Sequence, residues 1–283
     1  MTSTYKIPEL LQYMMDWEQE IKHEVPYLET PTGYFLQFDP YDHGGYLCSP
    51  ADAIVFANTG MDGIHYSFLT DFGYASDLSL APVIRVDPMN SGNYAKIVAS
   101  NIREFFALVF SGHEGLLLNE FASKQEYLNY IREQEDRASE GHSEYFDRKR
   151  WDLEKNKVRD LAMQRFDLQP IPDGYSYIQE SRQIRRGEVI IDTLDGLGVV
   201  LGKDLVSDHK RAEPHPWHEK EIPYDQEQQL KSYISSADQV GLFSLIRDSQ
   251  AQGFDDPDVY RAMKDRLVSF GLTMEAQKLM HYR

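Results

Sequence analysis

The chain has 283 residues, of which 41% are hydrophobic and 12% aromatic, so it carries enough apolar side chains to bury a core and is not a disordered protein. It has no apolar run of about 18 residues, which excludes a membrane-spanning helix. Cys48 is the only cysteine, which excludes an internal disulfide and disfavours a cysteine-based zinc site. The first residues lack the basic and apolar regions of a secretory signal, so a cytoplasmic protein is expected.

The formal net charge is -17, and it is concentrated near the amino terminus: residues 1–80 hold twelve acidic and two basic residues, a net of -10. Such a surface repels nucleic acid, because binding to phosphate depends on cations that release counterions. It attracts basic proteins, mainly by speeding their encounter. The alternative interpretation is that the acidic residues only keep the protein in solution.

The first half of the chain predicts an amphipathic helix, a set of strands and a second, strongly apolar helix. The opening helix covers Pro8–Glu24, with large apolar residues at helical spacing. A β-hairpin is expected where Asp62-Gly63 lies between two apolar runs, because this pair suits a tight reversal. One face of the second hairpin strand is expected to be buried and the other partly wet. The expected strands are Tyr34–Phe38, Ala53–Phe56, Ile64–Leu69 and Pro82–Val86, and the apolar helix is Ile97–Val109.

The remainder predicts charged helices, short strands and a helical end. Helices are expected over Lys124–Ala138 and Glu144–Phe166, where acids and bases alternate as on solvated helix faces. Short strands are expected over Tyr175–Tyr177, Glu188–Ile191 and Gly198–Leu201, and a loop over Asp208–Pro223. The last 60 residues predict short amphipathic helices over Leu230–Ile234, Val240–Ile246, Val259–Phe270 and Met274–Met280.

These elements predict an α+β protein with an antiparallel sheet and packed helices, followed by a largely helical region. The expected divisions are 1–122 for the α+β domain, 123–222 for charged helices and short strands, and 223–283 for a small helical region.

No pattern of residues predicts a catalytic site. His215 and His218, with His209 upstream, have side chains that zinc accepts, and Glu219 or Glu221 could add an oxygen, but the spacing matches no standard metal site. A second group of loop residues could hold a divalent cation, although it does not have the spacing of an EF-hand. That second group is Asp39, Asp42, His43 and Asp62. No metal or cofactor is therefore expected.

The order of elements at the amino terminus carries a family resemblance. An acidic opening helix precedes Ile54-Val-Phe56, the hairpin segment Thr59–Leu69 and the strand segment Pro82–Met89. The helix that closes the series contains Asn101-Ile-Arg-Glu-Phe-Phe106, which resembles the asparagine-leucine-x-glutamate-phenylalanine-leucine helix of the SUKH superfamily, the Smi/Knr-like domains. The resemblance covers roughly residues 5–121.

This resemblance implies an α+β domain without catalysis. It also implies a class of partner, because many bacterial SUKH domains are immunity proteins that bind polymorphic toxins, often nucleases. The acidic amino-terminal half agrees with such a partner, since a nuclease that grips phosphate is usually basic.

The function expected from the sequence is a non-enzymatic cytoplasmic binding protein that neutralises a basic, nuclease-type toxin, with no affinity for nucleic acid or membranes. The residues expected to contact the partner lie on or beside the hairpin: Asp39, Asp42, Asp62, His65 and Asp71. The alternative is a metal-assisted hydrolase that uses the loop histidines and aspartates. A third possibility is a scaffold role for the helical carboxy-terminal half.

Overall fold

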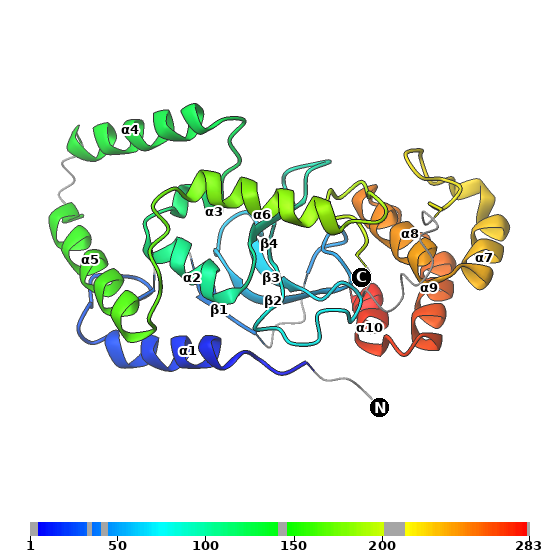
Figure 1. The fold of residues 1–283 in the computed structure, drawn as a ribbon, viewed down its shortest axis with the longest axis horizontal. Coiled ribbons are helices and arrows are strands. Elements are labelled where there is room, and N and C mark those ends of the chain that lie inside the picture. Colours follow the sequence, from blue (N-terminus) through cyan, green and yellow to red (C-terminus); the bar gives the residue numbers. More distant parts are fainter. Residues whose placement is uncertain (1–4, 33–35, 41–44, 141–145, 201–212, 282–283) are drawn as a thin grey trace.

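The computed structural model describes residues 5–32, 36–40, 45–140, 146–200 and 213–281. These residues form an α+β fold, as predicted, in which a five-stranded antiparallel sheet has helices packed around it (Figure 1). Each strand pairs with the next one along the chain, so the sheet is a meander. The strands are β1 (Gln37–Phe38), β2 (Ala53–Asn58), β3 (His65–Leu69), β4 (Val83–Val86) and β5 (Ala95–Ala99).

The predicted hairpin is confirmed by the pairing of β2 with β3, in which Ala53 lies opposite Leu69 and Asn58 opposite His65. The turn between these strands requires glycine at residue 63. Its φ is +70°, and a Cβ atom there would lie 2.4 Å from the hydroxyl of Tyr46. The expectation of a partly wet face on β3 is wrong, because every residue of this strand is buried. Helices cover one face of the sheet, and the loop that carries Leu197 packs on the other.

Helices α1 (Glu9–Ile21) and α2 (Ile102–Phe110) pack on the sheet through apolar faces. The prediction that the apolar helix begins at Ile97 is wrong, because Ile97 belongs to β5 and lies opposite Ile84 of β4. β-branched residues favour strands, and β4 offers a free edge for pairing. The helix begins after Asn101, whose side chain accepts a hydrogen bond of 3.0 Å from the backbone N–H of Glu104.

Four helices follow in the middle of the chain: α3 (Glu114–Leu118), α4 (Lys124–Glu140), α5 (Arg148–Arg165) and α6 (Gly174–Glu188). The charged helices expected here are confirmed as α4 and α5. The strand expected over Tyr175–Tyr177 is wrong, because these residues form the first turn of α6, which Asp173 caps through the backbone N–H of Ser176. Glu188 ends this helix, and the other two expected strands are reduced to one isolated bridge between Ile191 and Val199.

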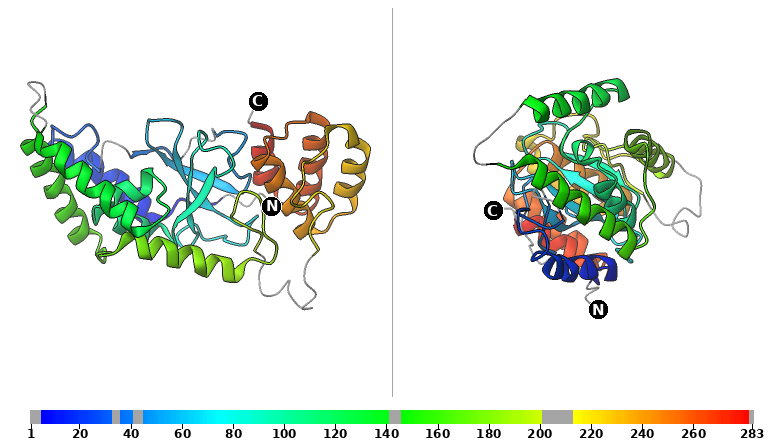
Figure 2. Two further views of the ribbon diagram at one scale, coloured as in Figure 1. Left: turned by 90° about the horizontal axis from the view of Figure 1, so that it is seen from above. Right: turned by 90° about the vertical axis from the view of Figure 1, so that its left-hand side faces the viewer.

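The end of the chain is helical, as the sequence predicts, and these helices gather at one end of the molecule (Figure 2). They are the short 3₁₀ helix η1 (Tyr224–Gln226), α7 (Glu227–Ser236), α8 (Gln239–Ala251), α9 (Pro257–Ser269) and α10 (Thr273–His281). In the loop expected before them, residues 213–223 have turns and irregular backbone, and residues 208–212 lie outside the described part of the chain. Residues Val240–Gln250 of α8 are all buried, so this helix is the centre of the unit.

Besides the small apolar cluster that includes Leu197, the described residues form two larger apolar cores. The first joins α1, α2 and the sheet with Val158, Ala162 and Ile178 of the middle helices. The second joins the carboxy-terminal helices to the sheet side, where Phe72 stacks on Phe243 with ring centroids 4.0 Å apart. None of the helices in the described residues has the length and apolar content that crossing a bilayer would require.

Candidate functional site: an apolar groove above a buried ionic network

A groove lies between the β3–β4 connection and α6, with β5 beneath it. It encloses a cavity of about 430 Å³, which is within the usual range for ligand sites. The apolar residues that line it are Tyr74, Ala75, Leu80, Pro82, Ile97, Ile184 and Val200.

Three large apolar side chains around this groove are exposed to solvent. The exposed fraction is 52% for Tyr74, 72% for Leu80 and 58% for Ile184. Single exposed apolar residues are common on any protein, but several around one cavity mark a surface that binds something.

The charged residues of the groove are predominantly acidic. Asp71 and Arg185 form a buried, bidentate ion pair in the floor, with both N–O distances at 2.6 Å, so their charges cancel. The carboxylates of Asp77 and Glu188 remain exposed along the lining. Hydrogen bonds from the side chain and backbone N–H of Ser79 lower the pKa of Asp77, which keeps this carboxylate charged.

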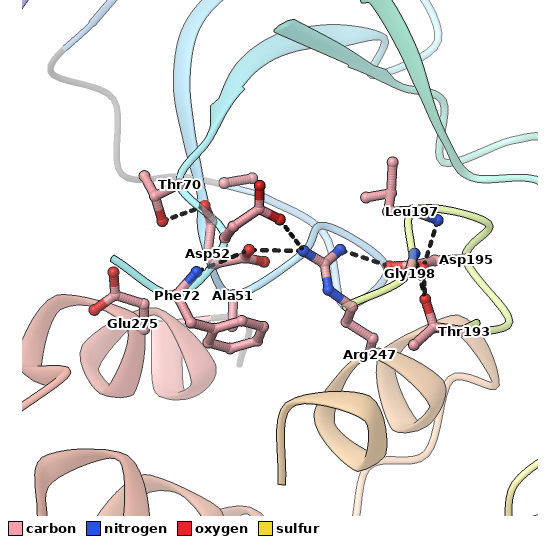
Figure 3. Close-up of polar contacts among 12 residues, drawn as sticks. Ala51, Asp52, Thr70, Phe72, Thr193, Asp195, Leu197, Gly198, Arg247 and Glu275 are labelled. Carbon is pink, nitrogen blue, oxygen red and sulfur yellow. Dashed lines mark hydrogen bonds and ion pairs between the residues drawn. The ribbon is translucent and has the colours of Figure 1, made fainter. Parts of the chain in front are cut away.

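The floor of the groove continues into an ionic network that joins the sheet to α8 (Figure 3). Arg247 of α8 lies between two loops, donating to Asp52 at 2.7 Å and to Asp195 at 3.0 Å. Its guanidinium is also 3.6 Å from Asp71, the partner of Arg185. All five side chains are at least nine-tenths buried, so the network fixes the sheet, α6 and the carboxy-terminal helices relative to one another.

The pKa values of Arg247 and Asp52 are both raised, for different reasons. Burial alone would lower the pKa of Arg247, but the carboxylates of Asp52, Asp195 and Asp71 outweigh it and raise that pKa above its ordinary value. Burial raises the pKa of Asp52 to about 6, although Arg247 opposes this shift. One oxygen of Asp52, Oδ1, has no hydrogen-bond partner among the described residues, which adds to the cost of its charge.

A second polar cluster lies on the same helix, one residue beyond Arg247. The Oδ2 atom of Asp248 is 2.9 Å from Nε2 of His215 and 3.3 Å from Nδ1 of His218. The other oxygen of Asp248 accepts a hydrogen bond of 2.8 Å from the backbone N–H of Leu194. Two of the histidines singled out in the sequence are therefore together, with Asp248 as their oxygen partner instead of the expected Glu219 or Glu221; His209 lies outside the described residues.

The residues expected to contact a partner do not form one exposed surface. Asp39 and Asp62 are exposed, as expected, while Asp42 and the neighbouring His43 lie outside the described residues. Asp71 was also expected on the surface, but it is buried and forms an ion pair with Arg185.

His65 is also buried and is unsuited to an exposed contact. Its Nδ1 lies 2.8 Å from the carbonyl oxygen of Gly63 and its Nε2 lies 3.2 Å from the hydroxyl of Ser49, and the ring stacks on Tyr46. These contacts show that His65 holds the hairpin turn against the loop before β2.

Sequence reasoning missed Arg185, Arg247 and Asp248. Arg185 lies on a part of α6 for which no element was predicted, and Arg247 and Asp248 lie just beyond the predicted helix Val240–Ile246. One signal was present for two of them: Arg247 and Asp248 directly follow Val240–Ile246, the most apolar of the carboxy-terminal segments. Charged residues within a buried helix are usually paired.

The chain matches none of the protein-family models, and no curated protein sequence matches it significantly.

Proposed function

We propose that this protein is a non-enzymatic binding module that holds a segment of a basic protein in the groove between the β3–β4 connection and α6. The observation that carries this proposal is the combination of exposed apolar side chains with the exposed carboxylates of Asp77 and Glu188 around a single cavity. Tyr74, Leu80 and Ile184 would cover an apolar side chain of the partner. Asp77 and Glu188 would face lysine or arginine residues beside it.

The overall charge favours the same class of partner. A net charge of -17 raises the encounter rate of a cationic protein and lowers that of an acidic one. Affinity would come from the apolar contacts, because exposed ion pairs at the rim of an interface contribute little.

The resemblance of the amino-terminal part to SUKH domains adds a biological role to this proposal. Under that resemblance the basic partner is a toxin of the nuclease type, and binding neutralises it. The groove is formed by residues 71–100 of the sheet side and by α6, so it includes the region of resemblance and one helix beyond it.

The proposal is tested by placing a photo-crosslinking amino acid, benzoylphenylalanine, at position 80 in native host cells. Leu80 is 72% exposed, so the change does not disturb the core. The matched control is position 153 on α5, where Leu153 is 70% exposed and lies away from the groove. We expect a crosslinked protein of basic isoelectric point from position 80 and none from position 153.

The captured protein is then purified and its binding is measured by surface plasmon resonance. Tyr74→Ala should weaken affinity by about fivefold or more, the loss typical of a buried aromatic contact. The double change Asp77→Asn with Glu188→Gln should slow association and reduce its dependence on salt. Equal crosslinking at both positions, or an affinity that neither variant alters, would overturn the proposal.

A further inference from the structure

The polar cluster on α8 has the geometry of a metal site. The two imidazole nitrogens and the carboxylate oxygen of His215, His218 and Asp248 all lie within 4.8 Å of one another. Two of the three separations are 2.9 Å and 3.3 Å. Tetrahedral zinc, with bonds of about 2.0–2.2 Å to nitrogen and oxygen, places its ligand atoms roughly 3.3 Å apart.

The structure holds these ligands in place without help from a metal. Asp248 lies on a fully buried helix, and the backbone N–H of Leu194 orients its carboxylate. The two histidines lie in one turn, closed by a hydrogen bond of 3.0 Å from the N–H of His218 to the carbonyl of His215. Between them, Trp217 packs edge-on against Tyr233 of α7, at 5.7 Å between ring centroids, which anchors the turn to the helices.

We propose that His215, His218 and Asp248 bind a zinc-type cation, with Nε2, Nδ1 and Oδ2 as ligand atoms. Two nitrogens and one oxygen suit zinc, whereas magnesium and calcium prefer sites made of oxygens. The Nδ1 atom of His215 makes no hydrogen bond to any described residue. The ring can therefore carry its proton on Nδ1 and present a bare Nε2 to the metal, whose bond would replace the present hydrogen bond between Nε2 and Oδ2 of Asp248.

Exposure shows where the fourth ligand would enter. The side chains of His215 and Asp248 are completely buried, while that of His218 is 18% exposed. Of the three described side chains, only that of His218 is reached by solvent, and on its side one water molecule can complete a tetrahedral site.

A metal here would fasten residues 215–218 to the helix that also carries Arg247. It would therefore strengthen the end of the molecule that the ionic network joins to the sheet. The proposed metal site shares no residue with the groove, so a failure of one proposal does not affect the other.

The test is calorimetric titration of the untagged, full-length protein with zinc chloride after removal of metals by chelation. We expect one equivalent of zinc to bind and to raise the melting temperature, while magnesium chloride does neither. Cobalt, which reports tetrahedral coordination through its visible absorption, should give an intense band.

Variants at the partly exposed ligand make the assignment specific. His218→Ala should weaken zinc binding by more than about 10-fold, since even changes to groups behind metal ligands cause losses of that size. His218→Cys, which restores a zinc ligand, should recover binding, and His23→Ala at an exposed position beyond α1 should leave it unchanged. The absence of stoichiometric zinc in the parent protein would overturn the site, as would equal affinity in the parent and His218→Ala proteins.

Discussion

Replacing Arg247 with methionine tests whether the buried ionic network holds the two cores together. The side chain of Arg247 is 1% exposed and donates hydrogen bonds to Asp52 and Asp195. Methionine keeps much of the length of the side chain and removes the charge. Asp71 keeps its bidentate partner Arg185, so the loss falls on the other two carboxylates.

The size of the effect follows from what each carboxylate retains. Asp195 still accepts hydrogen bonds from Thr193 at 2.5 Å and from the N–H of Leu197 at 3.0 Å. Within the described part of the chain, Asp52 keeps only a weak side-chain hydrogen bond of 3.3 Å from the N–H of Phe72 and loses Arg247, its one ion-pair partner there. Leaving a buried charge without its partner costs about 3–5 kcal/mol. We therefore expect Arg247→Met to lower the free energy of unfolding by about this amount at pH 7.5.

The effect should depend on pH, because the pKa of Asp52 is raised in the folded protein to about 6 from 3.8. A carboxyl whose folded pKa lies above its unfolded value favours folding at low pH. That contribution is complete below pH 3.8 and is lost as the pH rises through about 6. The difference corresponds to about 3 kcal/mol.

Removing Arg247 takes away the attraction that opposes this shift, so the pKa of Asp52 rises further in the variant. At pH 5.5 the carboxyl can then take up a proton and avoid an unpaired charge. The destabilisation by Arg247→Met should be smaller at pH 5.5 than at pH 7.5 by at least about 1 kcal/mol.

Urea unfolding followed by tryptophan fluorescence at both pH values measures these differences. Arg186→Met, a change of the same type at an exposed position of α6, is the control and should alter stability by no more than about 0.5 kcal/mol. Adding Asp52→Asn to Arg247→Met should recover part of the loss and remove its pH dependence. A destabilisation below about 1 kcal/mol, or one that is the same at both pH values, would refute the role assigned to the network.

Two further predictions concern single side chains. Burial lowers the pKa of Lys278 to about 8, so the stability of the parent protein should rise as the pH increases from 8 towards 10.5. Lys278→Met should remove this increase in stability with pH. At pH 7 it should stabilise the protein by about 1–3 kcal/mol, after allowance for the lost hydrogen bond to the carbonyl of Ala53. Thermal unfolding at pH 7 and pH 10 measures both changes in stability, and a pH profile equal to that of the parent protein would contradict them. Asn101→Ala should lower the free energy of unfolding by about 1 kcal/mol, because α2 loses its N-terminal cap, while Asn101→Asp should retain most of the stability. Equal urea midpoints for the alanine and parent proteins would show that the cap contributes nothing.

The sheet was predictable as far as strands and turns are marked by local patterns. The hairpin of β2 and β3 follows from Asp62-Gly63 between two apolar runs, and its pairing is the one expected. The start of α2 was misplaced, because Ile97 and Val98 fit the apolar periodicity of a helix as well as a strand. Pairing with β4 decides between the two, and that pairing is a long-range contact which periodicity does not report.

In the candidate sites, too, the sequence indicated the local features and missed the contacts between distant residues. The acidic character of the groove follows from the composition, but Asp71, expected on the surface, is neutralised in the floor by Arg185, 114 residues further along the chain. The two histidines of the cluster stand out in the sequence, whereas their partner Asp248 is 30 and 33 residues away and lies just beyond the apolar segment Val240–Ile246.

Residue order alone determined that this chain is an acidic α+β protein, with its strands near the amino terminus and helices at the carboxy terminus, because hydrophobic spacing and turn residues act over a few positions. Only the tertiary structure decided which of its charges face solvent. A carboxylate can be buried only when folding brings it a distant cation or hydrogen-bond donor, and that choice is made by how the helices pack on the sheet.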